Sequence, residues 1–454
     1  MTVRTKIERP SFREALGFWS KLGWISFGGT AAHIAIMHDA LVEERKWISN
    51  GRFLHALSLC MMLPGPEAQQ LAIYIGWKLH GKKGGVAAGA LFVLPSMFVL
   101  LALSVVYVVF GKLPWISSMF QGLKPAVIAL VLLALMKVAG RALRRPVHWV
   151  VGAAAFVCMF FLNVSLLWIL LGAVVAGGVV GYLWPSLTRV GKDAQVEEED
   201  ERGYFINRYS GGTEPLRKGW DVLRLAVVCV LLWLVSLSLF YFFADDFPFW
   251  RGLGLFFTKT AFVTIGGSYT VIPYVAQIAV TKLHWLSRAQ MMDGFALAET
   301  TPGPLIIVVG FVGFMAGYNH FHGSLWMGAL GLVATTFYTF LPCFLFVFAG
   351  APLVEKTQGK PAIEAVLGMI TAVVVGAILD LTLYLGKGVV FPSGMIAWRS
   401  VDVISVVWVA VCLVLLKRFR LNAIFLIALS VAFGGMRWMV ATHMHSGVFA
   451  FVRF

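Results

Sequence analysis

The sequence predicts an all-α polytopic membrane protein that consists of two inverted-topology repeats of broken or re-entrant and transmembrane helices. Hydrophobic residues make up 59% of the 454-residue chain and charged residues only 13%, which is too apolar for a soluble protein of this size. The apolar runs are continuous, as in residues 222–243, whereas the strands of a transmembrane barrel would alternate in polarity over about ten residues. The third observation is an internal repeat.

A stretch of fifty residues near the beginning of the chain returns 238 residues later. Residues 18–67 and 256–305 align without a gap and share twelve identities, where chance would give about three. Both copies contain a lysine, a glycine pair seven residues after it, and a Pro-Gly-Pro triplet. Secondary transporters are commonly built from two such copies, with the substrate held in mid-membrane where broken helices meet. Irregular backbone is tolerated at that depth only inside protein or beside a polar cavity, so these motifs indicate a site.

Thirteen apolar segments of about twenty residues are candidates for membrane insertion. Six lie in the first half, at residues 14–42, 51–80, 84–110, 116–140, 147–162 and 164–184. Six more lie in the second half, at 250–280, 289–319, 323–350, 362–386, 402–418 and 420–441, and the unmatched segment 221–243 joins the two sets. We therefore expect an N-terminal repeat over 1–184, a cytoplasmic linker over 185–220, a connecting transmembrane helix over 221–249 and an inverted C-terminal repeat over 250–454.

The distribution of Lys and Arg predicts the orientation in the membrane. An even number of segments per repeat plus one connecting helix inserts the second copy upside down relative to the first. With the N-terminus cytoplasmic and the C-terminus periplasmic, 25 basic residues fall in inside segments and 9 in outside segments. Arg45, Lys46 and Arg52 fall outside in this scheme, which leaves open that the first two segments are re-entrant hairpins. The net charge of +15 is read mainly as this topology signal, so no nucleic-acid partner is expected.

No pattern in the sequence indicates a cofactor, a metal ion or an enzyme. The five cysteines stand alone in apolar runs, and the histidine pairs at 320/322 and 443/445 lack nearby cysteine or acidic partners. The chain contains no phosphate-binding GxxxxGK[ST] loop, so an ion gradient is the expected energy source rather than ATP.

The substrate is expected to bind where the helices break. A proline cannot continue a helix but suits the first position of a new one, so each Pro-Gly-Pro should end one half-helix and start another. The new N-terminus presents unpaired N–H groups and a helix dipole, which together favour an anion. The glycine pairs would let backbone approach a ligand closely, although close packing of helices is the alternative. The backbone candidates are Gly28, Gly29, Pro64, Gly65, Pro66, Gly266, Gly267, Pro302, Gly303 and Pro304.

Charged side chains inside apolar segments complete the predicted site. Lys21 and Lys259 occupy equivalent positions in the two copies and would attract an anion, unless they snorkel to an interface. A further set of titratable residues would pair with the lysines or carry protons, and alternatively these residues have structural roles. These candidates for proton coupling are Glu67, Glu299, Asp380 and His33.

Four stretches of sequence closely resemble the chromate ion transporter (CHR) superfamily, in particular its long two-domain members that confer chromate resistance. They are FGGTAAH at Phe27–His33, LPGPEAQQL at Leu63–Leu71, IGGSY at Ile265–Tyr269 and ETTPGPL at Glu299–Leu305. The resemblance implies a multi-pass carrier of the bacterial inner membrane that expels chromate with the proton-motive force. It also implies sulfate as a competitor, and some relatives are tied to sulfate, so sulfate or another oxyanion is an alternative substrate.

Two other functions compete with this interpretation. A channel would share the chemistry of the site but would show uncoupled flux. A membrane enzyme acting on phosphorylated lipids would also use lysines and helix N-termini, but it predicts an acid and histidine cluster at the bilayer surface. Besides the oxyanion, the expected partners are protons and the lipid bilayer, and a homodimer is one assembly that the sequence allows.

Overall fold

The computed structural model describes residues 9–27, 29–111, 113–183, 203–207, 219–264, 268–351, 361–391, 401–419 and 421–445. Within these ranges the chain is helical apart from connecting turns and one isolated β-bridge between Ile48 and Ile206. The first half contains α1 (Phe12–Ile25), α2 (Gly29–His38), η1 (Asp39–Glu44), α3 (Asn50–Met62), α4 (Glu67–Phe110), α5 (Pro114–Ala142), α6 (Pro146–Phe160) and α7 (Leu166–Leu183).

The second half repeats this order after a connecting helix, α9 (Gly219–Phe243). It contains α10 (Phe247–Val263), α11 (Ser268–Thr281), α12 (Arg288–Glu299), η3 (Leu305–Ile307), α13 (Val308–His320), α14 (Leu325–Leu345), η4 (Phe346–Gly350), α16 (Pro361–Val390), α17 (Val403–Arg418) and α18 (Ala423–His445). Among the described helices, α4, α5, α7, α9, α14 with η4, α16 and α18 are long and apolar enough to cross a membrane. The protein is thus an all-α polytopic membrane protein, as predicted.

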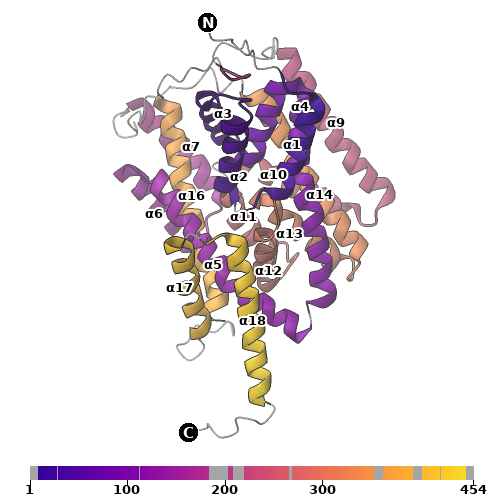
Figure 1. Ribbon diagram of the computed structural model, residues 1–454, viewed down its shortest axis with the longest axis vertical. Coiled ribbons are helices and arrows are strands. Elements are labelled where there is room, and N and C mark those ends of the chain that lie inside the picture. Colours follow the sequence, from indigo (N-terminus) through magenta and orange to yellow (C-terminus); the bar gives the residue numbers. More distant parts are fainter. Residues whose placement is uncertain are drawn as a thin grey trace.

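The predicted segments 14–42 and 51–80 are hairpins of short helices and do not cross the molecule. The guanidinium of Arg45, after α2 and η1, lies 3.1 Å from the carboxylate of Glu14 at the beginning of α1. Likewise the imidazole of His80, which follows the first part of α4, lies 2.9 Å from the carbonyl of Pro10. Each hairpin therefore returns to the end of the molecule from which it started, near the N-terminus (Figure 1).

The second half contains the same pair of hairpins. The imidazole of His320, at the end of α13, is hydrogen-bonded at 2.6 Å to the carboxylate of Asp246, which precedes α10. The side-chain amide of Asn319 donates a hydrogen bond of 2.8 Å to the carbonyl of Trp285, between α11 and α12. Segments 250–280 and 289–319 thus also fold back. All four segments are therefore helical hairpins, which is the alternative that the sequence left open for the first two.

The hairpins change the side on which several basic residues lie. The backbone N–H of Ile206, in the linker, donates to the carbonyl of Trp47 (2.9 Å), so the loop that carries Arg45 and Lys46 lies beside the linker. In the predicted topology this is the cytoplasmic side, where basic residues are favoured. By the same folding back, the loop before Arg288 moves to the opposite side. If the predicted orientation holds, inside loops still carry more basic residues than outside loops, and Arg45 and Lys46 no longer lie outside.

Residues His80 and Gly81 divide α4 into two antiparallel parts. Gly81 has a φ of +67°, which a glycine adopts readily, and this conformation reverses the chain. Gly76 then lies against the backbone of Gly84, and the side-chain amide of Gln69 reaches the carbonyl of Gly89 at 3.4 Å. The corresponding pair in the second half is α13 and α14, where Gly313 lies against Gly331.

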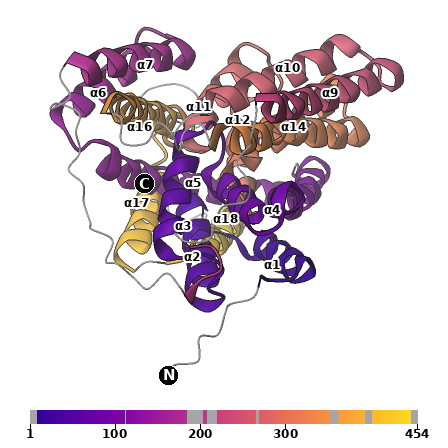
Figure 2. The same cartoon turned by 90° about the horizontal axis from the view of Figure 1, so that it is seen from above.

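The two halves exchange their last helices. Helices α6 and α7 of the first half pack on α16 of the second, and α17 and α18 of the second half pack on α5 of the first (Figure 2). Glycines permit the close approach: Gly152 lies against the backbone of Ala372, and Gly122 against that of Ser430. One continuous hydrophobic core runs through both halves, with large buried side chains such as Trp19, Trp250, Phe92, Phe311 and Tyr338.

Candidate functional site

The first helix of each half ends in the same way. Helix α1 ends at Ile25, and the hydroxyl of the next residue, Ser26, donates a hydrogen bond of 2.6 Å to the carbonyl of Leu22. Helix α10 ends at Val263, and the hydroxyl of Thr264 donates to the carbonyl of Thr260 at 2.8 Å. Both hydroxyl residues are fully buried. The side chains satisfy carbonyl groups of the last turn, while the main-chain carbonyls of Ser26 and Thr264 stay available to another partner.

The Pro-Gly-Pro triplet of each half supplies that partner to the other half. The backbone N–H of Gly65 donates to the carbonyl of Thr264 at 2.6 Å, and the N–H of Gly303 donates to the carbonyl of Ser26 at 2.7 Å. These bonds are reciprocal, because both donors and both acceptors are separated by the 238-residue repeat. Four broken helices, two from each half, therefore meet at one place, which we call the crossing.

Glycine is required at both donor positions of the crossing. Gly65 has a φ of +126° and Gly303 a φ of +93°, both in the region that side chains with a Cβ rarely adopt. A Cβ atom at Gly303 would also lie 2.6 Å from the hydroxyl oxygen of Ser96. The prolines that follow these glycines are in extended conformations: Pro66 directly precedes α4, and Pro304 precedes η3.

The structure brings the predicted backbone candidates of both halves together at the crossing. The sequence-predicted group Pro64, Gly65, Pro66, Pro302, Gly303 and Pro304 forms its centre. Gly29 starts α2 with a φ of +78°, directly after the break in the first half. Gly28, Gly266 and Gly267 lie outside the described residues. Whether this backbone binds a ligand stays a prediction.

Unpaired donors and polar side chains surround the crossing in the first half. The first turn of α4 begins at Glu67, and its free N–H groups follow Pro66 directly. The Glu67 carboxylate interacts with its own backbone N–H and lies within electrostatic reach of Arg141. The amides of Gln69 and Gln70, one turn on, are buried, and the Gln70 side chain donates to the Pro64 carbonyl.

His33 is a second buried polar group of the first half. The side chain is completely buried, packs edge-on against Phe92, and neither ring nitrogen meets hydrogen-bond geometry with a described residue. The backbone of Ser26 nevertheless lies close enough to interact with the ring. His33 therefore lies near the backbone of Ser26, at the edge of the crossing.

The second half contributes buried carboxylates from α12. Glu299, at the end of α12, is 8% exposed and makes no hydrogen bond or ion pair with a described residue. Asp293, between one and two turns earlier, accepts a hydrogen bond of 2.9 Å from the Tyr107 hydroxyl and lies 3.4 Å from the amino group of Lys124. Sequence reasoning missed Asp293 and Tyr107, although an acid inside an apolar segment was a usable signal.

The remaining candidates lie away from these contacts. Asp380 is half-buried on α16 and has no hydrogen-bond or ion-pair partner among the described residues. The side chains of Lys21 and Lys259 are exposed, whereas their neighbours Leu22 and Thr260 are buried. No group of three or more histidine, cysteine or acidic side chains that could hold a metal ion occurs in the described ranges.

Comparison with known proteins agrees with the duplicated architecture. The family described as "Chromate transporter" matches two separate regions, residues 13–178 and 251–435. The chain is 29% identical to the chromate transport protein of Cupriavidus metallidurans over 86% of this chain and 87% of that protein. It is 30% identical to the chromate transport protein of Pseudomonas aeruginosa, over 83% of this chain and 82% of that protein.

A more distant relative is an uncharacterized transporter of Methanocaldococcus jannaschii, which is 24% identical over 95% of this chain and 96% of that protein. No solved structure shows a significant match to the chain. The family match spans most of the chain, on both sides of the linker and connecting helix, and the two matched regions contain the two Pro-Gly-Pro triplets. The protein therefore belongs to the chromate transporter family.

Proposed function

We propose that this protein is a secondary active transporter that exports chromate across the bacterial inner membrane, driven by the proton-motive force. The two halves would alternate access to a site at the crossing, and sulfate or a similar oxyanion would compete with chromate. Relatives of this chain are named chromate transport proteins, and we extend chromate transport to this chain. The observation that carries it is the reciprocal pair of hydrogen bonds between the helix breaks.

The crossing is suited to a movement of one half against the other. In the described chain only two backbone hydrogen bonds join the breaks directly, and the internal repeat relates one bond to the other. A neutral hydrogen bond contributes on the order of 1 kcal/mol, so a bound substrate can offset the loss of one bond. Rocking of one repeat against the other around a fixed mid-membrane site is the usual arrangement for duplicated carriers.

An oxyanion fits the donors available there. Chromate is a tetrahedral dianion, and an unpaired dianion buried in protein would cost tens of kcal/mol. The first turns of α4 and of η3 with α13 follow the two Pro-Gly-Pro triplets and present backbone N–H groups with the positive end of a helix dipole. Because both first turns start at the crossing, one anion can receive donors from both halves.

Proton coupling is assigned to the carboxylates that break the symmetry. Glu299 is buried without a partner among the described residues, and a lone carboxylate in such surroundings exchanges a proton more readily than one in an ion pair. Glu67 is buried as well, but Arg141 and its own backbone N–H lie within electrostatic reach, whereas no such group of the described chain lies near Glu299. Glu299 is therefore our first candidate for the proton carrier, with Glu67, Asp380 and His33 as the others.

The decisive experiment is chromate uptake into inverted membrane vesicles, with and without a protonophore and with excess sulfate. We expect accumulation that depends on the energised membrane, because inverted vesicles turn export into uptake. Uptake that ignores the gradient would indicate a channel and contradict the coupled mechanism. Stronger flux of labelled sulfate than of chromate would keep the mechanism and change the substrate, whereas absence of both would remove the proposal.

A further inference from the structure

A cavity of about 540 Å³ lies between helices from both halves of the molecule. Its wall is formed by α5, the beginning of α12, the end of α16, the beginning of α17 and one residue of α18. Four basic side chains line it, and together with them an acid and a hydroxyl. These polar lining residues are Lys124, Arg288, Lys387, Arg437, Asp402 and Ser405.

The cavity lies towards the end of the molecule opposite the N-terminus. Arg288 follows the loop that pairs with the end of α13, and Lys387 and Asp402 flank the connection from α16 to α17. In the predicted topology this is the periplasmic side. Met292 of α12 also lines the cavity, and Glu299 at the crossing follows seven residues later, about 10 Å along the same helix.

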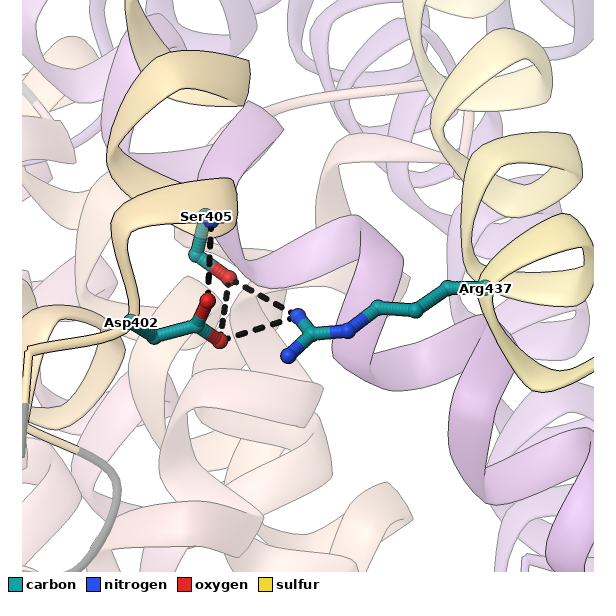
Figure 3. A network of polar contacts seen from close by, with 3 residues as sticks. All are labelled: Asp402, Ser405 and Arg437. Atoms are coloured by element: carbon teal, nitrogen blue, oxygen red, sulfur yellow. Dashed lines mark hydrogen bonds and ion pairs between the residues drawn. The ribbon is translucent and has the colours of Figure 1, made fainter. Parts of the chain in front are cut away.

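Two of the four basic residues are already neutralised by acids. The guanidinium of Arg437 lies 2.9 Å from Asp402 and 3.3 Å from the hydroxyl of Ser405 (Figure 3). Asp402 in turn accepts a hydrogen bond of 3.1 Å from the backbone N–H of Ser405, so the network is anchored at the beginning of α17. Lys124 reaches out of the cavity to Asp293 at 3.4 Å.

Arg288 and Lys387 have no acidic partner within the described residues. The guanidinium of Arg288 lies 4.4 Å from the centre of the Tyr384 ring, and the amino group of Lys387 lies 5.7 Å from the centre of the Phe160 ring. Cation–π contacts hold a positive charge in place without neutralising it. Among the described residues, four positive charges against Asp402 and Asp293 leave a net charge of +2 around the cavity.

We propose that this cavity is a second anion site, which binds a tetrahedral divalent oxyanion on the periplasmic side of the crossing. The inference rests on the proposed function, because the exported anion would bind in this cavity on its way out of the protein. The net charge of +2 balances that of a dianion. Since a water molecule occupies about 30 Å³ in the liquid, the volume accommodates an anion together with several waters, as expected of a release site rather than a tight one.

The first test is a local one, made at Ala289, which is exposed and lines the cavity. An Ala289→Cys variant in intact cells is treated with a negatively charged or a positively charged methanethiosulfonate reagent, with the unmodified chain as background for the native cysteines. We expect the anionic reagent to react at least fivefold faster, relative to the same pair of reagents on a free thiol, and sulfate to slow the reaction. Adding Lys387→Gln to this variant should weaken both the charge preference and the protection, because it removes one of the two uncompensated charges.

Equal rates for the two reagents, without protection by sulfate or chromate, would overturn the inference. The local test does not depend on flux, so it separates the two proposals. Active chromate transport without charge preference or protection would refute the second site alone. Protection of the thiol in a protein that moves neither chromate nor sulfate would refute the proposed function and keep the site.

The second test measures transport by the full chain. Arg288→Gln and Lys387→Gln should each raise the chromate concentration for half-maximal transport at least threefold, because each removes one of the two uncompensated charges. Arg251→Gln on α10 and Lys417→Gln on α17 are matched controls, since both side chains are exposed and Lys417 lies about 21 Å along α17 from its beginning. Unchanged concentration dependence in both cavity variants would contradict the inference.

Discussion

The two helix breaks at the crossing share one backbone design but carry different side chains. In both halves a buried hydroxyl residue ends the first helix (α1 or α10), and a glycine with positive φ follows the third (α3 or α12). The two are bonded across the halves. The acids differ: Glu67 follows its triplet, where the second half has Leu305, and Glu299 precedes its triplet, where the first half has Met61.

This difference indicates that the backbone and the side chains have separate roles. The shared backbone positions the breaks, because the conformation and the reciprocal bonds need only glycine, proline and a terminal carbonyl. The side chains that differ are the ones that can carry charge or protons. A symmetric scaffold with an asymmetric set of titratable groups is therefore the arrangement to test.

The largest effect is expected at the asymmetric ion pair between Lys124 and Asp293. Lys124→Met should lower the free energy of unfolding by about 3–5 kcal/mol, because it leaves a carboxylate buried without its charge partner. The double variant Lys124→Met/Asp293→Asn should recover most of that loss. Unfolding of the purified protein in detergent measures both values. The single variant Asp293→Asn completes the comparison. If the loss in the double variant equals the sum of the losses in the two single variants, the two side chains do not interact.

Alanine at Gly65 or at Gly303 tests the shared backbone. Each substitution should destabilise the protein by about 1–3 kcal/mol, because the native φ is unfavourable for a residue with a Cβ. Gly172→Ala is the control, since no atom lies within 4 Å of the added Cβ in α7. Thermal unfolding in detergent compares the three variants. A strong loss in one crossing variant and none in the other would break the symmetry of the backbone.

Glutamine at Glu299 or at Glu67 tests the difference between the halves. Glu299→Gln should reduce protonophore-sensitive chromate accumulation at least tenfold, which corresponds to about 1.4 kcal/mol, because the buried carboxylate loses its proton site. Glu67→Gln should have a smaller effect, because Arg141 and a backbone N–H lie within electrostatic reach of Glu67, whereas no such group among the described residues lies near Glu299. The vesicle assay ranks the two variants, and the reverse order would move proton coupling to the first half.

The smallest effect is expected at the matched lysines. Lys21→Ala and Lys259→Ala should each change chromate flux by no more than about threefold, or roughly 0.7 kcal/mol, because both side chains are exposed and no described residue holds them in a fixed geometry. Flux normalised to the amount of inserted protein is the measurement. Complete loss in either variant would return that lysine to the substrate site, as the sequence pattern suggests.

The hairpins show how far the sequence could predict the fold. The repeat, the breaks at Pro-Gly-Pro and the all-α class follow from local residue preferences and from the hydrophobicity needed in lipid. The side of the membrane on which a short helix ends does not follow from the sequence, because a half-helix and a full crossing have the same composition. The loop with Arg45 and Lys46 gave the one useful signal, because a topology with full crossings places these basic residues on the outside, where they are unfavourable.

The sequence by itself thus determined the family, the duplication and the backbone motifs of the candidate site, since each depends on residue types at fixed spacings. Only the tertiary structure decided which distant groups meet: Gly65 with Thr264, Gly303 with Ser26, and Asp293 with Lys124 and Tyr107. It also gathered Arg288 and Lys387 at one cavity, from helices about one hundred residues apart in the chain. The physical reason is that the exchange of helices between the halves sets these contacts, and packing between distant segments leaves no periodic trace in a single sequence.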